Sequence, residues 1–436
     1  MSHLISNLGS TFLNHVLRDR DCKRAIVHDM DSFPKKHMKT KPKYSVRNGL
    51  AGASALLRTA LSSPSIQAAN YAIVDLGTLG GTTSFARDVN NNRQVTGNAQ
   101  TPVGEPSPRL NVFSYSGSGP MTNIGTLAGS NNFSRGFAIN DSGVIVGESD
   151  NNSSRAFVFR EGVMTGLTRL AGDNDRGVAH DINNAGTIVG ISSNGTVSRP
   201  TLWTDTGTGY APSDLGTIAG TSTSTGRAWA INVDGAATGL STNASGTSQA
   251  TLWSGGTITN LTSLGDGTRF SLGYGLNASN IVVGSSLTGQ SVGGLIGTSS
   301  TTSITRAFVS GTVGLSELIP VNLYSASNNG PTTNYHSIAN DINDTGLIVG
   351  NSQRISGSAA VATIWIDGVP TDLNTLIPGG SGWNLLSAEG INDAGDIVGF
   401  GSFQGANRAF LLTAVPEPSS ALLAVLSASL LLRRKR

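Results

Sequence analysis

The feature that most constrains the fold is a short phrase that occurs seven times between residues 71 and 413. Each copy has an apolar residue, then Asn, and then Gly seven positions after that Asn, as in DINNAGTIVG over residues 181–190. The seven asparagines are Asn90, Asn140, Asn183, Asn232, Asn277, Asn343 and Asn392. Successive asparagines lie 50, 43, 49, 45, 66 and 49 residues apart. A period of this length predicts an array of equivalent supersecondary units.

Two further phrases recur in a constant order with the first. One is exemplified by DLGTLGG (75–81) and the other by RAFVF (155–159). Each unit therefore holds about four short β-prone runs separated by turn residues. Asn-Asp-x-Gly between two apolar runs is typical of a hairpin, because Asn and Asp cap the turn and Gly accepts a positive φ. Four strands in a unit of this length favour a propeller blade over a helical solenoid repeat.

The order of the phrases also predicts how the array ends. The body opens with YAIVDLGTLGG, which lacks a preceding RAF-type strand, and its last unit ends with a spare one, RAFLLT (408–413). That last strand can complete the blade that the first residues begin. We therefore expect an all-β fold, a seven-bladed β-propeller; the alternative, an open β-solenoid, would need a cap at each end. The Gly/Ser/Thr-rich insertion at 285–305 is expected to project from one rim as a flexible loop.

The repeated phrases also resemble a known family. RAFVF, DLGTLGG and AINDSGVIVG are similar to the repeats of HAF-repeat extracellular proteins, named for a His-Ala-Phe triplet, and the resemblance covers residues 71 to 413. Arg replaces the His of the triplet here, so the chain departs from the family pattern at that position. The resemblance implies an exported bacterial protein and supplies no known chemistry.

Charge distribution argues against nucleic acid as a partner. Residues 71–414 contain no Lys and have 14 Arg against 22 Asp and Glu, whereas basic residues concentrate at both ends of the chain. Binding to phosphates requires a basic face, which an acidic body does not supply. Cys22 is the only cysteine, so the body has no disulfide, thiol nucleophile or cysteine metal site.

Few residues of the body point to catalysis or metal binding. His180 and His336 are its only histidines, and a metal site usually needs three or four ligands, so ordinary strand or rim positions are expected. The Asn/Asp turns could offer oxygens to Ca²⁺, but they lack the alternating acidic spacing of a calcium loop, and turn capping is the favoured interpretation. No cofactor and no catalytic residue is predicted.

Four of the five tryptophans divide into two groups by their place in the repeat. Trp203, Trp253 and Trp365 occupy the same repeat position, which predicts packing between blades. Trp383, in GGSGWNLL, lies outside that register and is a candidate for stacking on a sugar.

The segment before the repeats has the order of an export signal. Residues 1–37 are expected to be an upstream extension or disordered. Residues 38–69 place three Lys and an Arg before a mildly apolar run and small residues, the order of a secretory signal peptide, with mature protein beginning near Asn70. Arg58 interrupts the apolar run, and a disordered tail is the alternative.

Residues 414–436 follow the propeller region and end the chain. They contain a Pro-Glu-Pro tripeptide, an apolar run from Ala421 to Leu432 and a basic end. That run is shorter than the roughly 20 residues that a membrane helix needs. The order resembles a PEP-CTERM sorting signal, and its matching residues are Val415, Pro416, Glu417, Pro418, Arg433, Arg434, Lys435 and Arg436. The resemblance implies processing by an exosortase in the inner membrane of a Gram-negative, exopolysaccharide-producing bacterium.

Together these patterns predict an exported protein, held briefly in the inner membrane by a short C-terminal helix and then located at the cell surface or outside the cell. The expected function is non-enzymatic: binding of exopolysaccharide, biofilm or other surface components. A glycosidase or lyase acting on extracellular polysaccharide is the alternative, since the fold alone decides neither.

Overall fold

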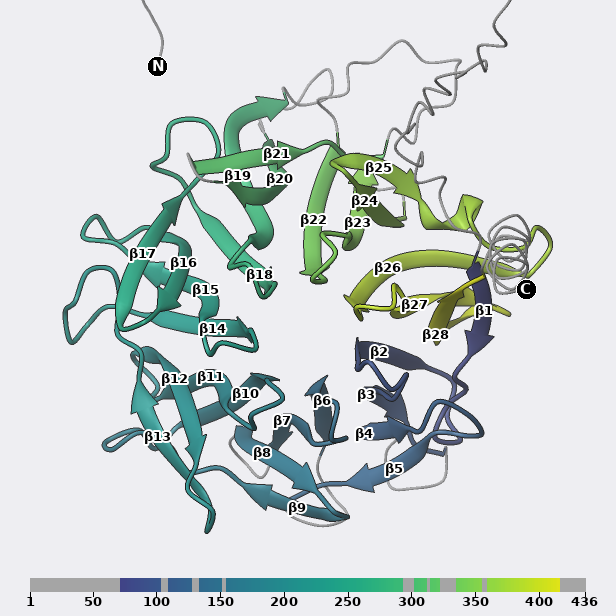
Figure 1. Cartoon of the computed structure of the whole chain (residues 1–436), viewed down its shortest axis with the longest axis horizontal. Helices are drawn as coiled ribbons and strands as arrows, with labels where there is room; N and C mark the ends of the chain where they lie inside the picture. The colour runs from purple at the N-terminus through teal and green to yellow at the C-terminus, as the bar shows by residue number, and fades with distance from the viewer. Residues whose placement is uncertain are drawn as a thin grey trace, which may run out of the picture. The chain divides into compact units, whose positions relative to one another are not determined.

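Seven four-stranded antiparallel sheets form blades around a central axis (Figure 1). The structure, a computed structural model, describes residues 71–102, 109–127, 133–150, 154–292, 302–311, 314–321, 335–354 and 359–415. The predicted all-β, seven-bladed propeller is confirmed. The expected signal segment and nearly all of the expected sorting signal lie outside the described residues.

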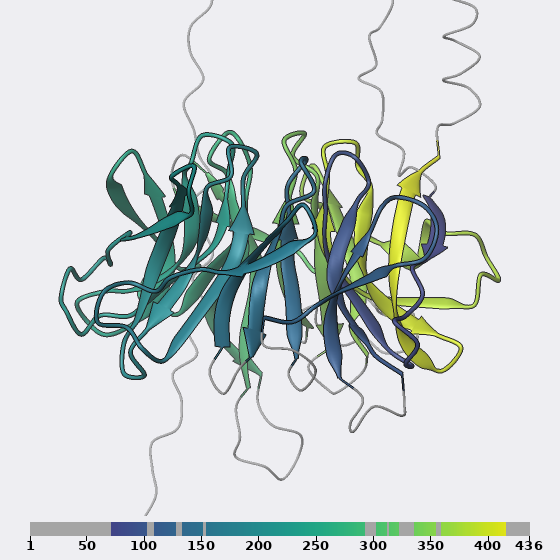
Figure 2. The same ribbon diagram turned by 90° about the horizontal axis from the view of Figure 1, so that it is seen from below.

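Each blade has four strands, which run between the two faces of the ring (Figure 2). The innermost strands are β2 (Ser84–Val89), β6 (Ser134–Ile139), β10 (Arg176–Ile182), β14 (Gly226–Ile231), β18 (Ser271–Leu276), β22 (Tyr335–Ile342) and β26 (Trp383–Ile391). The second strands are β3 (Val95–Gln100), β7 (Ile145–Asp150), β11 (Ile188–Ser193), β15 (Ala237–Thr242), β19 (Val282–Val292), β23 (Ile348–Arg354) and β27 (Ile397–Phe403). The third strands are β4 (Leu110–Tyr115), β8 (Ser154–Arg160), β12 (Ser198–Asp205), β16 (Ser248–Ser254), β20 (Thr302–Gly311), β24 (Val361–Ile366) and β28 (Ala406–Ala414). The outermost strands are β5 (Thr122–Gly125), β9 (Val163–Gly166), β13 (Tyr210–Asp214), β17 (Thr257–Thr262), β21 (Gly314–Leu318), β25 (Val369–Asp372) and β1 (Tyr71–Asp75).

The first and last strands share one blade and so close the ring. Strand β1 pairs antiparallel with β28, with Tyr71 opposite Ala414 and Asp75 opposite Phe410. The backbone N–H of Tyr71 also donates to the Leu376 carbonyl at 2.8 Å. The predicted closure by the spare RAF-type strand is confirmed.

The repeated Asn opens a tight hairpin between the first and second strands. In the second blade, the Gly143 N–H donates to the Asn140 carbonyl at 2.9 Å, and the Asn140 N–H donates to the Val144 carbonyl at 3.1 Å. The residue three positions after each Asn has a positive φ, and in five of the seven turns it is Gly. Arg93 and Asn280 hold this conformation in the other two turns, each with a φ of 61°. This is the three-residue hairpin in which the last turn residue is left-handed.

The repeated Gly seven positions after the Asn is required for a different reason, the lack of space for a side chain. It lies on the second strand, opposite an irregularity in the innermost strand of the same blade. A Cβ on Gly239 would lie 1.9 Å from the Arg227 carbonyl oxygen, and one on Gly147 would lie 1.9 Å from the Arg135 oxygen. The register of β14 with β15 shifts between Ala228 and Ala230, which leaves Trp229 as a β-bulge. All seven innermost strands carry this bulge, and glycine admits the close backbone approach that it creates.

The packing between blades uses large side chains of the third strand. Trp203 and Trp365 are fully buried, and Trp253 is 4% exposed. Their indole N–H groups donate to the backbone carbonyls of Thr168, Ile319 and Gly216 at 2.7, 2.7 and 3.0 Å. The predicted core position of these three tryptophans is confirmed.

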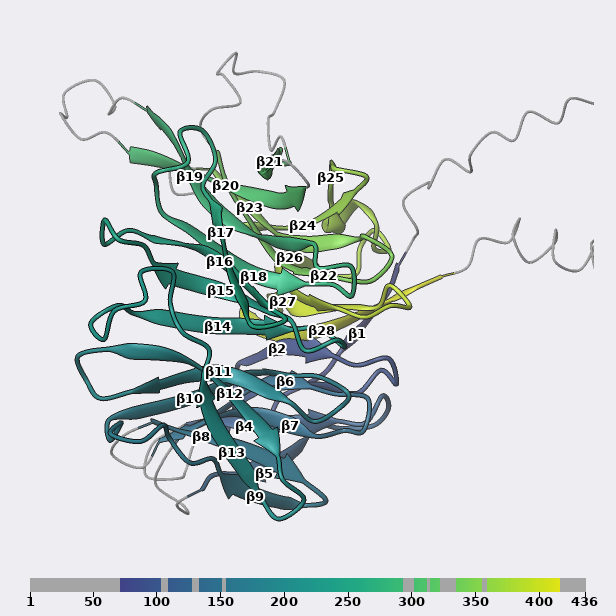
Figure 3. The same ribbon diagram turned by 60° about the vertical axis from the view of Figure 1, so that its left-hand side comes forward.

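Two further observations complete the fold. The insertion at 285–305 was expected as a flexible loop, but its described residues lengthen β19 and β20 to 11 and 10 residues, so the hairpin projects beyond its neighbours (Figure 3). The described residues have a short 3₁₀ turn, η2 (Leu373–Thr375), and none of their helices is long and apolar enough to cross a membrane.

Candidate functional site

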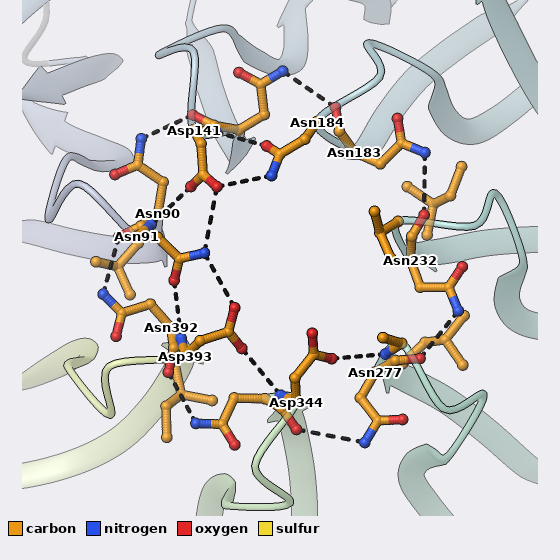
Figure 4. Close-up of a pocket in the computed structure, with 18 of the residues that line it drawn as sticks. Asn90, Asn91, Asp141, Asn183, Asn184, Asn232, Asn277, Asp344, Asn392 and Asp393 are labelled. Carbon is orange, nitrogen blue, oxygen red and sulfur yellow. Dashed lines mark hydrogen bonds between the residues drawn. The ribbon is translucent and has the colours of Figure 1, made fainter.

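The seven repeated asparagines form a closed ring around the axis of the propeller (Figure 4). Each side-chain amide donates from Nδ2 to the backbone carbonyl of the Asn in the following blade. The seven distances, in chain order from Asn90, are 2.8, 3.2, 3.1, 3.0, 3.5, 2.9 and 3.0 Å. All seven bonds run in the same rotational sense, so each asparagine joins its own blade to the next.

The oxygen of the same side-chain amide, Oδ1, stabilises the asparagine's own turn. Oδ1 of Asn140 accepts from the N–H groups of Ser142 and Val144 at 3.1 and 3.0 Å. All seven asparagines are buried, with 4–7% exposure. Aspartate could supply the acceptor but not the donor, and only an amide has both. The repeated Asn is therefore a structural joint between blades.

A second layer of polar side chains lies directly after the ring asparagines. Oδ1 of Asp344, Asp393 and Asp141 accepts from the backbone N–H of Ala278, Asp344 and Asn91 at 2.7, 3.1 and 2.9 Å. Val233 and Ala278 interrupt the layer, since their side chains have no acceptor. The two layers line a cavity of about 210 Å³ at this face of the ring.

Three partly buried aspartates link neighbouring blades deeper in the channel. Asp88 accepts from Val89 of its own blade and from Ile139 of the next blade, both at 2.7 Å. Asp181 makes the same pair of bonds with Ile182 and Ile231. Burial raises the pKa of Asp88 to about 6 and, together with the charge of Asp88, raises the pKa of Asp181 to about 7.

The third aspartate, Asp341, repeats this arrangement between the sixth and seventh blades. It accepts from Ile342 and Ile391 at 2.8 and 2.9 Å. Burial raises the pKa of its carboxyl well above the usual range, with the Asp88 charge as a second cause. Because both oxygens of each carboxyl hold backbone N–H groups, these residues fasten blades together.

The seven bulge residues line a second cavity of about 240 Å³. They stand three positions before each ring asparagine, which places them roughly 10 Å along the innermost strand. They are Arg87, Phe137, His180, Trp229, Tyr274, Asn340 and Glu389. No two are alike, although the positions around them repeat. A bulge directs a side chain out of the regular ladder, and here it directs seven different chemistries into one channel.

Four of these residues form a continuous aromatic arc from the second to the fifth blade. Ring centroids lie 5.8 Å apart for Phe137 and His180, 6.3 Å for His180 and Trp229, and 5.2 Å for Trp229 and Tyr274. All four side chains are half-buried, so part of each ring faces the cavity. The arc therefore gives one side of the cavity an aromatic wall.

The other three bulge residues form a polar arc. Arg87 Nη1 donates to Glu389 Oε2 at 2.5 Å, and Ser387 Oγ donates to Glu389 Oε1 at 2.6 Å. Asn340 Nδ2 donates to the Ala388 carbonyl at 2.8 Å. The ion pair crosses the seam between the first and last blades, so the polar arc depends on ring closure.

His180 is neutral at physiological pH and has a defined tautomer. Burial lowers the pKa of His180 to about 4. Its Nδ1 lies 2.8 Å from the Ala228 carbonyl oxygen, which can only accept, so Nδ1 carries the proton. Nε2 is then an unprotonated acceptor in the wall of the cavity.

The other candidates from the sequence do not join this site. Trp383 stacks on Phe403 with centroids 4.7 Å apart and packs edge-on against Phe410. The face of Trp383 that covers Phe403 is therefore not available to stack on a sugar. His336 Nδ1 instead accepts from the Thr305 N–H at 3.1 Å. Within the described ranges, no group of three or more His, Cys, Asp or Glu is suited to hold a metal ion.

Of the sorting-signal residues, Val415 alone belongs to the described part of the chain, and it is exposed. Pro416, Glu417, Pro418, Arg433, Arg434, Lys435 and Arg436 lie outside the described residues.

Comparison with known proteins gives structural likenesses only. No family model and no curated protein matches the sequence. Puromycin hydrolase is similar over 76% of this chain and 54% of its own, with 11% identity and a TM-score of 0.45. TolB from Acinetobacter baumannii is similar over 68% and 65%, with 14% identity and a TM-score of 0.36. A mutant of the Aleuria aurantia lectin AAL in complex with Fucalpha1-6GlcNAc is similar over 70% and 100%, with 15% identity and a TM-score of 0.31.

These likenesses correct one expectation. The chain spans about half the length of the puromycin hydrolase structures. The inference that a chain of this kind is not an enzyme is wrong, because the structures that resemble it include these hydrolases. At 11% identity, the likeness transfers no activity to this chain.

Proposed function

We propose that the chain is an exported protein of the bacterial surface or extracellular matrix whose propeller binds a component of the exopolysaccharide or biofilm. The observation that carries the binding proposal is the set of bulge residues. The repeat keeps its asparagine ring and its glycine in every blade, yet it places seven different side chains around one cavity. A framework that keeps its asparagine and glycine but carries seven different side chains at its channel-facing bulge is what a ligand site requires, whereas a purely structural ring needs no such variety.

The proposed location rests on the two ends of the chain. The signal-like order of residues 38–69 and the resemblance of residues 415–436 to a PEP-CTERM signal support export and processing by an exosortase-type enzyme. The short apolar run would hold the chain in the inner membrane until that processing. An acidic, lysine-free body is compatible with a glycan partner and unfavourable for nucleic acid.

Co-sedimentation of the full chain with exopolysaccharide from an exopolysaccharide-producing Gram-negative bacterium tests the binding proposal. We expect retention of the chain in the polymer fraction, and loss of that retention when Trp229 and Glu389 are both replaced by Ala. Polymer size is followed in the same samples by gel filtration, so that any cleavage is detected alongside binding. Equal retention of the wild-type and variant chains would contradict binding in the channel.

A further inference from the structure

We propose that the cavity formed by the bulge residues binds one neutral sugar unit, stacked on Trp229 and Tyr274 and hydrogen-bonded by Arg87, Asn340 and Glu389. This inference rests on the proposed function and specifies its ligand. It follows from the shape, the division of chemistry and the charge of the cavity.

The aromatic arc matches the apolar side of a sugar ring. A pyranose presents axial C–H groups on one face, and such a face packs against an aromatic ring, whose own face carries a partial negative charge. Trp229 and Tyr274 are adjacent, with centroids 5.2 Å apart and planes inclined at 44°. Two inclined rings from neighbouring blades offer a wall broad enough for one such face.

The polar arc supplies the hydrogen bonds that hydroxyl groups need. Arg87 Nε is a buried donor with no hydrogen-bond partner among the described residues. That atom is closed to solvent, so the donors to a ligand hydroxyl are the terminal NH₂ groups of Arg87, whose side chain is 36% exposed. Glu389 is fixed from both sides by Arg87 and Ser387, so its lone pairs are preorganised to accept from a hydroxyl.

The charges disfavour an anionic ligand, because three aspartates of the lining have no cation partner among the described residues. Arg87 neutralises Glu389 at 2.5 Å, and both oxygens of each of the three channel aspartates hold backbone N–H groups. An aromatic wall with an unpaired acid would instead favour a quaternary ammonium group. Here Glu389 already has Arg87 as its cation, and the three aspartates turn both carboxyl oxygens to backbone N–H groups. The polar arc therefore offers hydrogen bonds that hydroxyl groups can use and a quaternary ammonium group cannot.

The volume limits the ligand to one unit. The cavity measures about 240 Å³, below the roughly 300–1,000 Å³ that drug-sized ligands occupy. We therefore infer that a terminal sugar of a chain, or a free monosaccharide, enters the cavity, with the rest of a polymer remaining outside.

Calorimetric titration of the full chain with methyl glycosides of neutral hexoses and of fucose tests this inference, with tetramethylammonium and methyl glucuronide as charged probes. We expect at least one neutral glycoside to bind and both charged probes to bind at least about tenfold more weakly. Saturable binding of tetramethylammonium in preference to every glycoside would overturn the assignment.

Three variants locate the ligand. Trp229→Ala is expected to weaken binding by about tenfold or more, as is typical of a central aromatic contact. Trp229→Phe should retain much of the affinity while losing the ligand-induced change in tryptophan fluorescence, and it tests the site even if Trp229→Ala fails to fold. Phe270→Ala removes an exposed aromatic ring outside the cavity lining and should leave affinity unchanged.

The outcomes separate this inference from the proposed function. If the polymer binds but affinity and fluorescence are the same in the Trp229 variants as in the wild type, the sugar does not lie on this arc, and surface binding stands. If neither polymer nor any glycoside binds the folded chain, both proposals fail.

Discussion

The side-chain amide of Asn392 donates to the backbone carbonyl of Asn90 at 3.0 Å, across 302 residues of sequence. The same bond joins every other pair of neighbouring blades, so the seam between the chain's two ends resembles the six other joints. Two ion pairs reinforce the seam: Arg87 with Glu389, and Arg93 with Asp396 at 2.9 Å. The ring is therefore closed at its inner edge by side chains and at its outer edge by the pairing of β1 with β28.

Replacing one ring asparagine by aspartate should break one joint. Asn183→Asp keeps an acceptor for the Thr187 N–H but loses the donor to the Asn232 carbonyl and places a carboxylate beside that oxygen. We expect the free energy of unfolding to fall by about 1–3 kcal/mol, measured by denaturant titration. Asn194→Asp is the matched control, because the exposed Asn194 accepts through Oδ1 from the Thr196 and Val197 N–H groups of its own turn and, among the described residues, donates to no other blade. Equal losses in both variants would contradict the joint.

The glycine opposite each bulge should tolerate no side chain. In Gly239→Ala the added Cβ would meet the Arg227 carbonyl oxygen at 1.9 Å, and backbone cannot move aside as a flexible side chain can. The expected loss is at least about 3 kcal/mol of unfolding free energy. Gly209→Ala, where a Cβ meets nothing within 4 Å, should change stability little. A stable Gly239→Ala protein would show that the bulge is not constrained by this contact.

These two positions illustrate what sequence can predict. The Asn hairpins and the seven blades follow from local chemistry that recurs, and the closure follows from a spare strand. The bonds between Asn183 and Asn232 depend on which carbonyl the next blade presents, which sequence does not specify. The bulge residues were missed because seven unrelated side chains form no motif. The signal that could have found them is the constant Gly on the facing strand, which marks a close backbone approach.

The tryptophans make the same point. The place of Trp383 outside the repeat register favours a binding role, yet Phe403 already stacks on it. Trp229 is the tryptophan that lines the channel. Its position three residues before Asn232 becomes informative once the innermost strand is known to bulge there.

Stability should fall as pH rises from about 6.5 to 8. The folded pKa of Asp181 is about 7, above the unfolded value of 3.8, so the folded state binds more protons than the unfolded state in this range. The free energy of unfolding therefore decreases as the pH rises through 7 and Asp181 loses its proton. His180 opposes this change by a smaller amount, because its folded pKa of about 4 lies below the unfolded value of 6.5 and the unfolded imidazole is still losing its proton just above pH 6.5. We expect a decrease of about 1 kcal/mol from Asp181, measured by urea unfolding at the two pH values.

Asp181→Asn provides the control for that titration. The amide cannot gain or lose a proton in this range, so the decrease should become smaller. The variant should also be less stable at pH 6.5, because its NH₂ group faces one of the N–H donors of Ile182 and Ile231. An unchanged pH dependence in Asp181→Asn would assign the titration to other groups.

Processing at the C-terminal signal is expected to remove the residues after Pro418. Mass spectrometry of the chain isolated from an exosortase-containing host should find the mature protein without residues 419–436. Glu417→Ala should retain them, because the acidic residue of the Pro-Glu-Pro segment would be missing. Recovery of the wild-type protein with this tail still attached would contradict the sorting proposal.

The bulges have a consequence for how such a chain changes its specificity. A bulge residue has no partner in the strand ladder, so its identity imposes little on the pairing of its own blade. The asparagine joint and the glycine contact that hold the ring lie at other positions. Arg87, His180, Asn340 and Glu389 also bond to a neighbouring blade. Single substitutions at Phe137, Trp229 and Tyr274 can therefore redesign the aromatic side of the lining while the scaffold stays the same. A new ligand would need no new loop, and natural drift or a combinatorial library could reach it one residue at a time.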